Sequence, residues 1–283
     1  MDLTVGEAAS RPGTGLGADA PLSAAVETME RSGQRRVPVL REGRVVGIVT
    51  AGDVRRHLSR LAGGRSAWDF AAALGRTCVE DVMTAPALTA QPDEPLGAAI
   101  SRMLDAGVEA LPVLDPAGGL AGMLTRRDVL RAGVRRARLT WGLVAQQMTR
   151  AVRTVAPDTP ATEAARELRE TGLHVLPVLE GERLVGVIHA RDLAAEAERG
   201  EAAPGSRSPE GSRVLQGRAV RELMRPPSGY LLESDPLHTA LVRMLDRDVY
   251  GLPVISEGGR LLGVVTVTDV LSAVAGRTRA PAP

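Results

Sequence analysis

The chain has 283 residues, of which 44% are hydrophobic and 24% are charged, and its formal net charge at pH 7 is +1. This composition is typical of a globular protein of about two domains, and the small net charge excludes a global field that would attract nucleic acid or acidic lipid. All 35 basic residues are arginine and Cys78 is the single cysteine, which excludes a Walker-type lysine, Schiff-base chemistry, an intrachain disulfide and a paired-cysteine metal site.

One pattern occurs four times along the chain: an apolar run with a central proline, a short turn, a second apolar run and an aspartate. The first apolar runs are Val37-Pro38-Val39, Leu111-Pro112-Val113, Leu176-Pro177-Val178 and Leu252-Pro253-Val254. Two apolar runs around a turn rich in Gly, Pro or Glu predict a β-hairpin. Apolar residues at helical spacing follow the aspartate, so we expect each hairpin to lead into a helix.

A second helix is predicted before each hairpin, after a short strand. A proline lies 17 residues before each hairpin proline, at Pro21, Pro95, Pro160 and Pro236. Proline suits the first turn of a helix, where its missing N–H would have had no partner. Glycine, which readily adopts the left-handed conformation after a helix, ends three of these helices, and Asp248 takes its place in the fourth copy.

The copies predict four units in two pairs. The distance from the hairpin proline to the aspartate is 15 residues in copies one and three and 16 in copies two and four, which indicates a duplicated pair. A unit of this size cannot bury a core alone, so the units should pack on one another. We expect units at residues 1–60, 78–135, 144–199 and 218–276, paired as modules 1–135 and 144–276, with a mobile linker at 200–217. The predicted fold class is α/β in the α+β sense, with a small sheet and two packed helices in each unit and two pseudo-twofold pairs.

These motifs resemble the CBS domain family, named for cystathionine β-synthase. The resemblance is carried by the leading Val-x-x-x-Met-Thr (Val79 to Thr84 and Val144 to Thr149), the hairpin proline, and the ending Gly-hydrophobic-hydrophobic-Thr-x-x-Asp. Family members pair their units into a Bateman module, whose cleft binds adenosine nucleotides or related ligands. The resemblance therefore implies AMP, ADP, ATP, S-adenosylmethionine or cyclic di-AMP as candidate ligands, no obligatory cofactor, and a homodimer.

The candidate ligand site is the Thr-x-x-Asp ending of each copy. Threonine at the start of a helix with an acid three residues later is a capping box. The same geometry suits a ligand, because free helix N–H groups bind phosphate and a carboxylate accepts hydrogen bonds from both ribose hydroxyls. The repeat alone leaves both interpretations open. The predicted ligand residues are Thr50, Asp53, Thr125, Asp128, Asp192, Thr266 and Asp269.

The resemblance favours the ligand interpretation, because the family uses the matching aspartate for ribose. The third copy also keeps Asp192, although His189 replaces its capping threonine. His189 has two interpretations, a catalytic base and a substituted cap at a degenerate site, and we favour the substituted cap.

The resemblance also implies a phosphate contact from the paired unit, made by the residue three before the hairpin proline. This assigns Arg35, with Arg36 beside it, to the Asp128 site, and His174 to the Asp269 site. Arginine offers a fixed fork of donors that matches phosphate, whereas His174 would help chiefly when protonated.

The reciprocal residues are less favourable for phosphate. Glu109 would face the site of Thr50 and Asp53, and Tyr250 would face the Asp192 site. A carboxylate repels phosphate, more strongly in a cleft than in water. We therefore predict that the second-unit site binds best and the fourth next, and that the odd-numbered sites are empty or take uncharged adenosyl groups.

The function expected from these residues is a regulatory adenosine-nucleotide-binding module that senses energy or a second messenger. It would control an unknown partner protein through ligand-dependent shape change. The alternative is a protein-interaction scaffold with vestigial, empty clefts. We expect no enzyme and no metal site, because the four histidines form no HExxH motif and no GxSxG occurs.

Two further expectations concern partners and location. The basic run 131–138 is open to two interpretations, a contact with nucleic acid or an acidic partner, and a solvated helix face. We favour the solvated face because five aromatic residues are too few for base-stacking platforms. The first thirty residues do not resemble a signal peptide and no uncharged apolar stretch reaches membrane-spanning length, so we expect a cytoplasmic protein.

Overall fold

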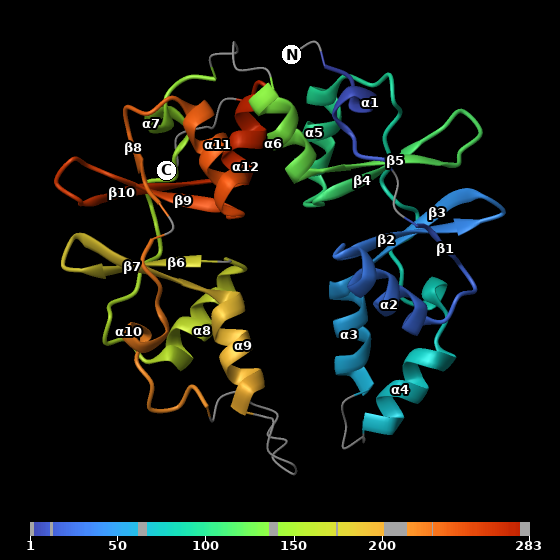
Figure 1. Cartoon of the computed structure of the whole chain (residues 1–283), viewed down its shortest axis with the longest axis horizontal. Helices are drawn as coiled ribbons and strands as arrows, with labels where there is room; N and C mark the ends of the chain where they lie inside the picture. The colour runs from blue at the N-terminus through green and yellow to red at the C-terminus, as the bar shows by residue number, and fades with distance from the viewer. Residues whose placement is uncertain are drawn as a thin grey trace. The chain divides into compact units, whose positions relative to one another are not determined.

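The computed structural model describes residues 3–11, 14–61, 67–135, 141–173, 175–200, 214–227 and 229–277. In this part of the chain each copy of the repeat forms a small sheet with helices packed beside it, so the predicted α/β class is confirmed (Figure 1). None of the described helices is long and apolar enough to cross a membrane.

The first copy illustrates the order of elements in the repeat. It contains β1 (Leu16–Gly17), α2 (Leu22–Ser32), β2 (Arg36–Arg41), β3 (Arg44–Thr50) and α3 (Ala51–Leu61), and is followed by α4 (Ala67–Arg76). The short α1 (Val5–Ala8) precedes it. β1 pairs in parallel with β2, which pairs antiparallel with β3. Pro21 directly precedes α2, and Gly33 ends it with a φ of 66°, a left-handed conformation that costs glycine little.

The second copy has the same order of elements. It contains η1 (Val79–Asp81), α5 (Leu96–Asp105), β4 (Ala110–Leu114), β5 (Leu120–Thr125) and α6 (Arg126–Arg135). Its predicted short strand is reduced to one parallel bridge between Ala90 and Val113. The arginines at 131 and 135 are exposed on α6, whereas the two residues after Arg131 are buried. The described part of the basic run therefore places its arginines on the exposed face of a packed helix.

The third and fourth copies repeat this arrangement. The third contains α7 (Val144–Gln147), α8 (Ala161–Thr171), β6 (Val175–Glu180), β7 (Arg183–His189) and α9 (Ala190–Gly200). The fourth contains α10 (Val220–Leu223), β8 (Leu231–Leu232), α11 (Leu237–Arg247), β9 (Gly251–Ile255), β10 (Leu261–Thr266) and α12 (Val267–Val274). Asp248 ends α11 with a φ of 51°, so it adopts the left-handed conformation that glycine has elsewhere.

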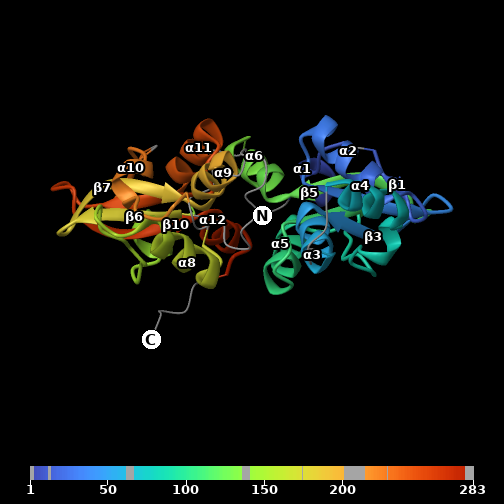
Figure 2. The same cartoon turned by 90° about the horizontal axis from the view of Figure 1, so that it is seen from below.

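The chain divides into two compact units, Met1–Arg135 with Val274–Thr278, and Arg136–Ala273 with Arg279–Pro283. Copies one and two share the first compact unit, and copies three and four share the second. Within each compact unit the two hairpins lie side by side in both views (Figure 1, Figure 2). Backbone hydrogen bonds join them, from Val45 N–H to the Gly118 carbonyl (3.1 Å) and from Leu184 N–H to the Gly259 carbonyl (3.3 Å).

The two copies of each compact unit exchange their leading segments, which are residues 3–10, 78–84, 143–149 and 219–225. Segment 78–84 lies on the first copy, where Thr84 pairs with Ile48, and segment 3–10 lies on the second copy, where Ser10 pairs with Met123. The second compact unit repeats the exchange through the pairs Thr149–Val264 and Arg225–Val187. The edge of each hairpin is therefore covered by a segment that belongs, in sequence, to the other copy.

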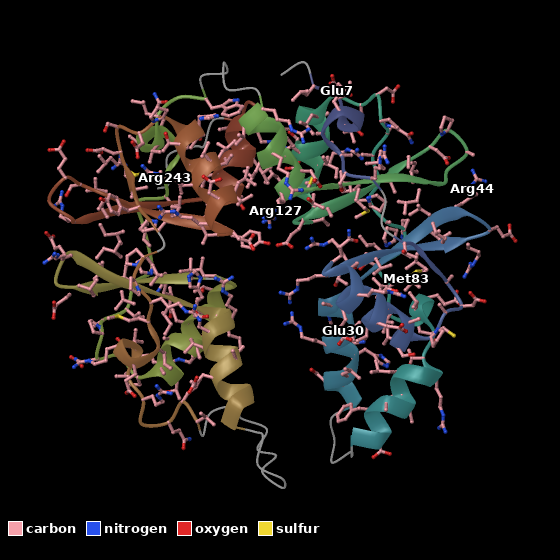
Figure 3. The ribbon with its side chains drawn as sticks, in the orientation of Figure 1. Glu7, Glu30, Arg44, Met83, Arg127 and Arg243 are labelled. Carbon is pink, nitrogen blue, oxygen red and sulfur yellow. The ribbon has the colours of Figure 1, made fainter. Side chains whose placement is uncertain are left out.

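A hairpin glycine makes room for the exchanged segment. Met83 lies against Gly47 on the first copy (Figure 3). On the third copy a Cβ built on Gly186 would lie 2.8 Å from Met224 Sδ, closer than real side chains approach. This close packing requires the glycine that begins the Gly-hydrophobic-hydrophobic-Thr motif.

The predicted linker at 200–217 is wrong at its end. Residues 201–213 lie outside the described residues, but Leu215 is buried in the core of the third copy with Leu168, Leu176 and Ile188. An apolar side chain in the core anchors this segment, because burying it removes apolar surface from water.

Candidate ligand site

Each hairpin leads directly into a helix. The second hairpin strand ends at the motif threonine, or at His189 in the third copy, and the helix begins at the next residue. The first helical N–H is held by the residue three before the hairpin proline: Ala51 N–H donates to the Arg35 carbonyl (2.9 Å), and Arg126 N–H donates to the Glu109 carbonyl (3.2 Å). The fold thus gathers the predicted residues of each copy at one place, which we call the helix junction.

The three threonines form capping interactions with their aspartates. At the second junction Thr125 N–H donates to Asp128 Oδ2 over 2.9 Å, the Thr125 hydroxyl donates to the same oxygen, and Asp128 N–H donates to Thr125 Oγ1 over 3.2 Å. Thr50 with Asp53, and Thr266 with Asp269, make the same N–H and hydroxyl donations. The capping interpretation therefore describes the local structure, and it occupies Oδ2 of each carboxylate.

The other carboxylate oxygen, Oδ1, has different surroundings. Asp53 Oδ1 is 3.0 Å from Arg56 Nη2, whereas Asp128 Oδ1 is 3.6 Å from Arg131 Nη1, which is longer than a normal hydrogen bond. Asp128 is only 5% exposed. A buried carboxylate needs compensating partners, so Oδ1 of Asp128 keeps acceptor capacity that a ligand hydroxyl can use.

The third junction has lost its cap. Asp192 Oδ1 pairs with Arg225 of the exchanged segment over 2.8 Å, while Asp192 Oδ2 is buried without a hydrogen-bond partner. Burial lowers the pKa of His189, the positive charges of Arg191 and Arg225 lower it further, and Asp192 opposes them. His189 is therefore neutral at neutral pH and does not replace the threonine hydroxyl as a donor to Asp192 in the described contacts.

An ion-pair cluster in the first compact unit involves Arg36, one of the predicted phosphate contacts. Arg36 pairs with Glu109, and Glu109 Oε1 lies 3.8 Å from Arg126 Nη1. The resemblance to the family assigned Arg36 to the Asp128 site, and the sequence pattern did not indicate a role for Arg126. The position of Arg126 could have indicated it, because a cation on the first residue of a helix is unfavourable to the helix dipole. Arg127, labelled in Figure 3, follows it on α6.

The remaining predicted phosphate contacts are less defined. The Arg35 side chain is exposed and makes no ion pair within the described part of the chain. Tyr250 is 61% exposed, and its carbonyl accepts the first N–H of α12 over 2.9 Å. His174 lies outside the described residues. The structure thus places Arg35 and Tyr250 at helix junctions through their backbone, without fixing a ligand contact for either side chain.

A surface pocket of about 460 Å³ lies away from the junctions, near the turn between β2 and β3. Its walls include Asp19, Glu42 and Glu80, and none of the predicted ligand residues. Arg41 also lines the pocket and pairs with Glu80, which leaves two carboxylates of the described lining unpaired, and these would repel a phosphate. Among the residues that the structure describes, no group of three or more His, Cys, Asp or Glu is placed to hold a metal ion.

The repeated hairpin–helix units, exchanged segments and capped junctions define a class of paired α/β repeats. Residues 5–60, 79–135, 144–199 and 220–276 each match the family model described as "CBS domain". Because these matches cover most of the chain, it belongs to the CBS domain family and carries four copies of the domain.

Two proteins of similar length match nearly the whole chain. The uncharacterized protein MJ1225 of Methanocaldococcus jannaschii is 27% identical over 258 residues, which cover 87% of this chain and 90% of that protein. Its crystal structure, described as a proposed archaeal homologue of g-AMPK, matches with a TM-score of 0.67 over 96% of this chain and 100% of that chain, at 25% identity. A conserved protein from Pyrococcus horikoshii shows the same fold, with a TM-score of 0.70, 20% identity and the same coverage.

A shorter relative has been crystallised with a ligand. CBSX2 from Arabidopsis thaliana, in complex with AMP, is 25% identical and covers 47% of this chain and 97% of its own, with a TM-score of 0.40.

Proposed function

We propose that this protein is a regulatory module that binds an adenosine ligand and controls a partner protein through ligand-dependent change of shape. Membership of the CBS domain family supports the proposal, as does the likeness to MJ1225 along nearly the whole chain. We propose no catalytic step and no obligatory cofactor. The protein would act as a homodimer on a partner protein whose identity is unknown.

The observation that carries the proposal is the Asp128 carboxylate. Its Oδ2 accepts from Thr125, and its Oδ1, 3.6 Å from Arg131, retains acceptor capacity at a buried position. A vicinal diol supplies two neighbouring O–H donors, and a carboxylate can accept both. The ribose of an adenosine ligand has this diol, so Asp128 can hold it without giving up its capping role.

The junction also supports binding of an anionic group. α6 begins at this junction, where the helix dipole favours an anion, and Arg126 adds a positive charge. We propose that Asp128 is the best site and Asp269 the next. Asp269 is 7% exposed and keeps its capping threonine.

A protein-interaction scaffold with empty clefts is the second candidate. Two observations favour the scaffold. His189 replaces the capping threonine of the third copy, and Glu109 forms an ion pair with Arg36 in the first compact unit. Both features reduce the affinity of these places for phosphate.

Calorimetric titration of the full chain with AMP, ADP, ATP, S-adenosylmethionine and cyclic di-AMP separates the two candidates. The proposal predicts saturable binding of at least one of these ligands, with heat that is absent when guanosine monophosphate replaces AMP. A chain that binds none of the five, yet retains its cooperative unfolding, is a scaffold with empty clefts.

A further inference from the structure

Three charged side chains of the first compact unit form a chain of ion pairs. Arg36 from the start of β2 pairs with Glu109 Oε2, and Glu109 Oε1 lies 3.8 Å from Arg126 Nη1. The Glu109 side chain is 43% exposed, whereas Arg36 and Arg126 are 25% and 22% exposed. The partly exposed Glu109 carboxylate is thus shared by two guanidinium groups that are less exposed than it is.

Arg126 is incompletely satisfied by this arrangement. Its Nε is buried and has no hydrogen-bond partner, and its distance from Glu109 is that of a loose ion pair. Arg126 also stands on the first residue of α6, where the helix dipole favours an anion. The other copies have Ala51, Ala190 and Val267 at this position. An arginine that violates local preferences in one copy alone suggests that a second anion approaches it.

Glu109 lies between two helix junctions. Arg36 is the register partner of Thr50 across the first hairpin, and Arg126 directly follows Thr125. A carboxylate that reaches both arginines therefore stands near the capped ends of α3 and α6. A phosphate bound at either junction would approach the two cations that Glu109 already holds.

We propose that Glu109 is a specificity-determining residue that competes, as an internal anion, with the phosphate of a bound ligand for Arg36 and Arg126. This inference rests on the proposed adenosine-binding function and adds how the site discriminates ligands by charge. A phosphorylated ligand must displace Glu109, so it loses part of the affinity that the arginines would otherwise provide. Adenosine carries no phosphate and leaves the ion pairs in place.

Two substitutions that break the same ion pair have opposite expected effects. Glu109→Gln removes the competing charge with little change in shape and should strengthen AMP binding about two- to fivefold, the range expected for partly exposed pairs. Arg36→Ala removes a phosphate partner and leaves Glu109 to repel the ligand, so it should weaken AMP binding. Adenosine affinity should change in neither variant.

The matched control is Glu80→Gln. Glu80 pairs with Arg41 in the same compact unit, has a similar exposed fraction (37%), and lies on the pocket away from the junctions. Calorimetry on the full chain should give wild-type affinities for both ligands in this variant. If Glu109→Gln leaves AMP affinity unchanged, weakens it, or strengthens adenosine equally, the ion pair is structural and the inference is wrong.

Inorganic pyrophosphate distinguishes this failure from failure of the proposed function. If no adenosine ligand binds the wild-type chain, the proposed function is wrong. Titration of pyrophosphate, followed by phosphorus NMR, then still tests the competition. Tighter binding to Glu109→Gln than to wild type and to Glu80→Gln supports it, and equal binding to all three contradicts it.

Discussion

The two oxygens of the Asp128 carboxylate have different partners. Oδ2 receives both donors of Thr125, whereas Oδ1 lies 3.6 Å from Arg131. Alanine would remove both oxygens and therefore could not separate capping from ligand binding. Asparagine keeps one side-chain oxygen for the Thr125 N–H and removes the charge and the second acceptor.

We predict that Asp128→Asn weakens AMP binding by about tenfold or more, because a hydrogen bond to a charged group contributes roughly 1.5–3 kcal/mol. Loss of a cap costs about 0.5–2 kcal/mol, and the free energy of unfolding should fall by less than this because the asparagine oxygen still caps α6. Calorimetry and urea denaturation measure the two effects. The matched control is Asp81→Asn, since Asp81 accepts from Cys78 N–H in the same local geometry away from the junctions. A variant at Asp128 that binds AMP normally but unfolds more easily would mean that this acid only caps α6.

His189 provides a second residue-scale prediction. Its replacement by threonine should restore donors to the buried Asp192 Oδ2 and raise the free energy of unfolding by about 0.5–2 kcal/mol at pH 7.5. Equilibrium urea denaturation tests this. A less stable His189→Thr chain would show that the imidazole packs better than the restored cap.

The same variant should change the pH dependence of stability. Burial lowers the pKa of His189 below its ordinary value of 6.5, so the unfolded chain takes up the proton first as the pH falls. Burial of neutral His189 therefore contributes fully to the stability of the folded chain above pH 6.5. This contribution is lost as the pH falls through the lowered pKa. The stability advantage of His189→Thr over wild type should grow between pH 7.5 and pH 5.5. An advantage that stays constant or shrinks over this interval would contradict the assigned shift.

At the scale of elements, helices and hairpins could be predicted because their signals are local. Pro21 marks the residue before α2, Gly33 marks its end, and the apolar runs around each turn became antiparallel pairs with the predicted central proline. The threonine and aspartate of the first, second and fourth junctions were indicated by the same repeat, as were His189 and Asp192 of the third. Strand lengths were less accurate, since the short first strand of the second copy is a single bridge at Ala90.

The exchange of leading segments could not be predicted in this way. Segment 78–84 precedes the second copy in sequence, and nothing in its residues indicates that Thr84 pairs with Ile48 of the first copy. The pair of Arg36 with Glu109 is hidden for the same reason, since 73 residues separate them. Such contacts depend on how copies pack, which local propensity does not encode.

The exchange predicts a sensitive glycine. Gly186→Ala places a Cβ 2.8 Å from Met224 Sδ and 3.2 Å from the Arg225 carbonyl, so it should lower the free energy of unfolding by about 1–3 kcal/mol. Adding Met224→Ala should recover part of this loss. Gly258→Ala is the control, because its nearest neighbour is the Ser256 hydroxyl at 3.8 Å. If Gly186→Ala is as stable as Gly258→Ala in urea denaturation, the exchanged segment is not tightly packed on this hairpin.

For the whole molecule, the repeat predicted which copies pack together, and the two compact units join copies one with two and three with four. The differences between the copies carry the functional information. The second junction combines an intact cap, a buried acid and Arg126, while the third has lost its threonine. We therefore expect occupancy to be unequal, with the second junction filled first and the third empty.

A crystal structure of the full chain grown with saturating AMP tests this account most directly. It should show the ribose hydroxyls donating to Asp128 Oδ1 and the phosphate near Arg126, with Glu109 displaced from at least one of its arginines. A well-ordered AMP molecule away from every helix junction, or four empty junctions at saturating AMP, would contradict the account.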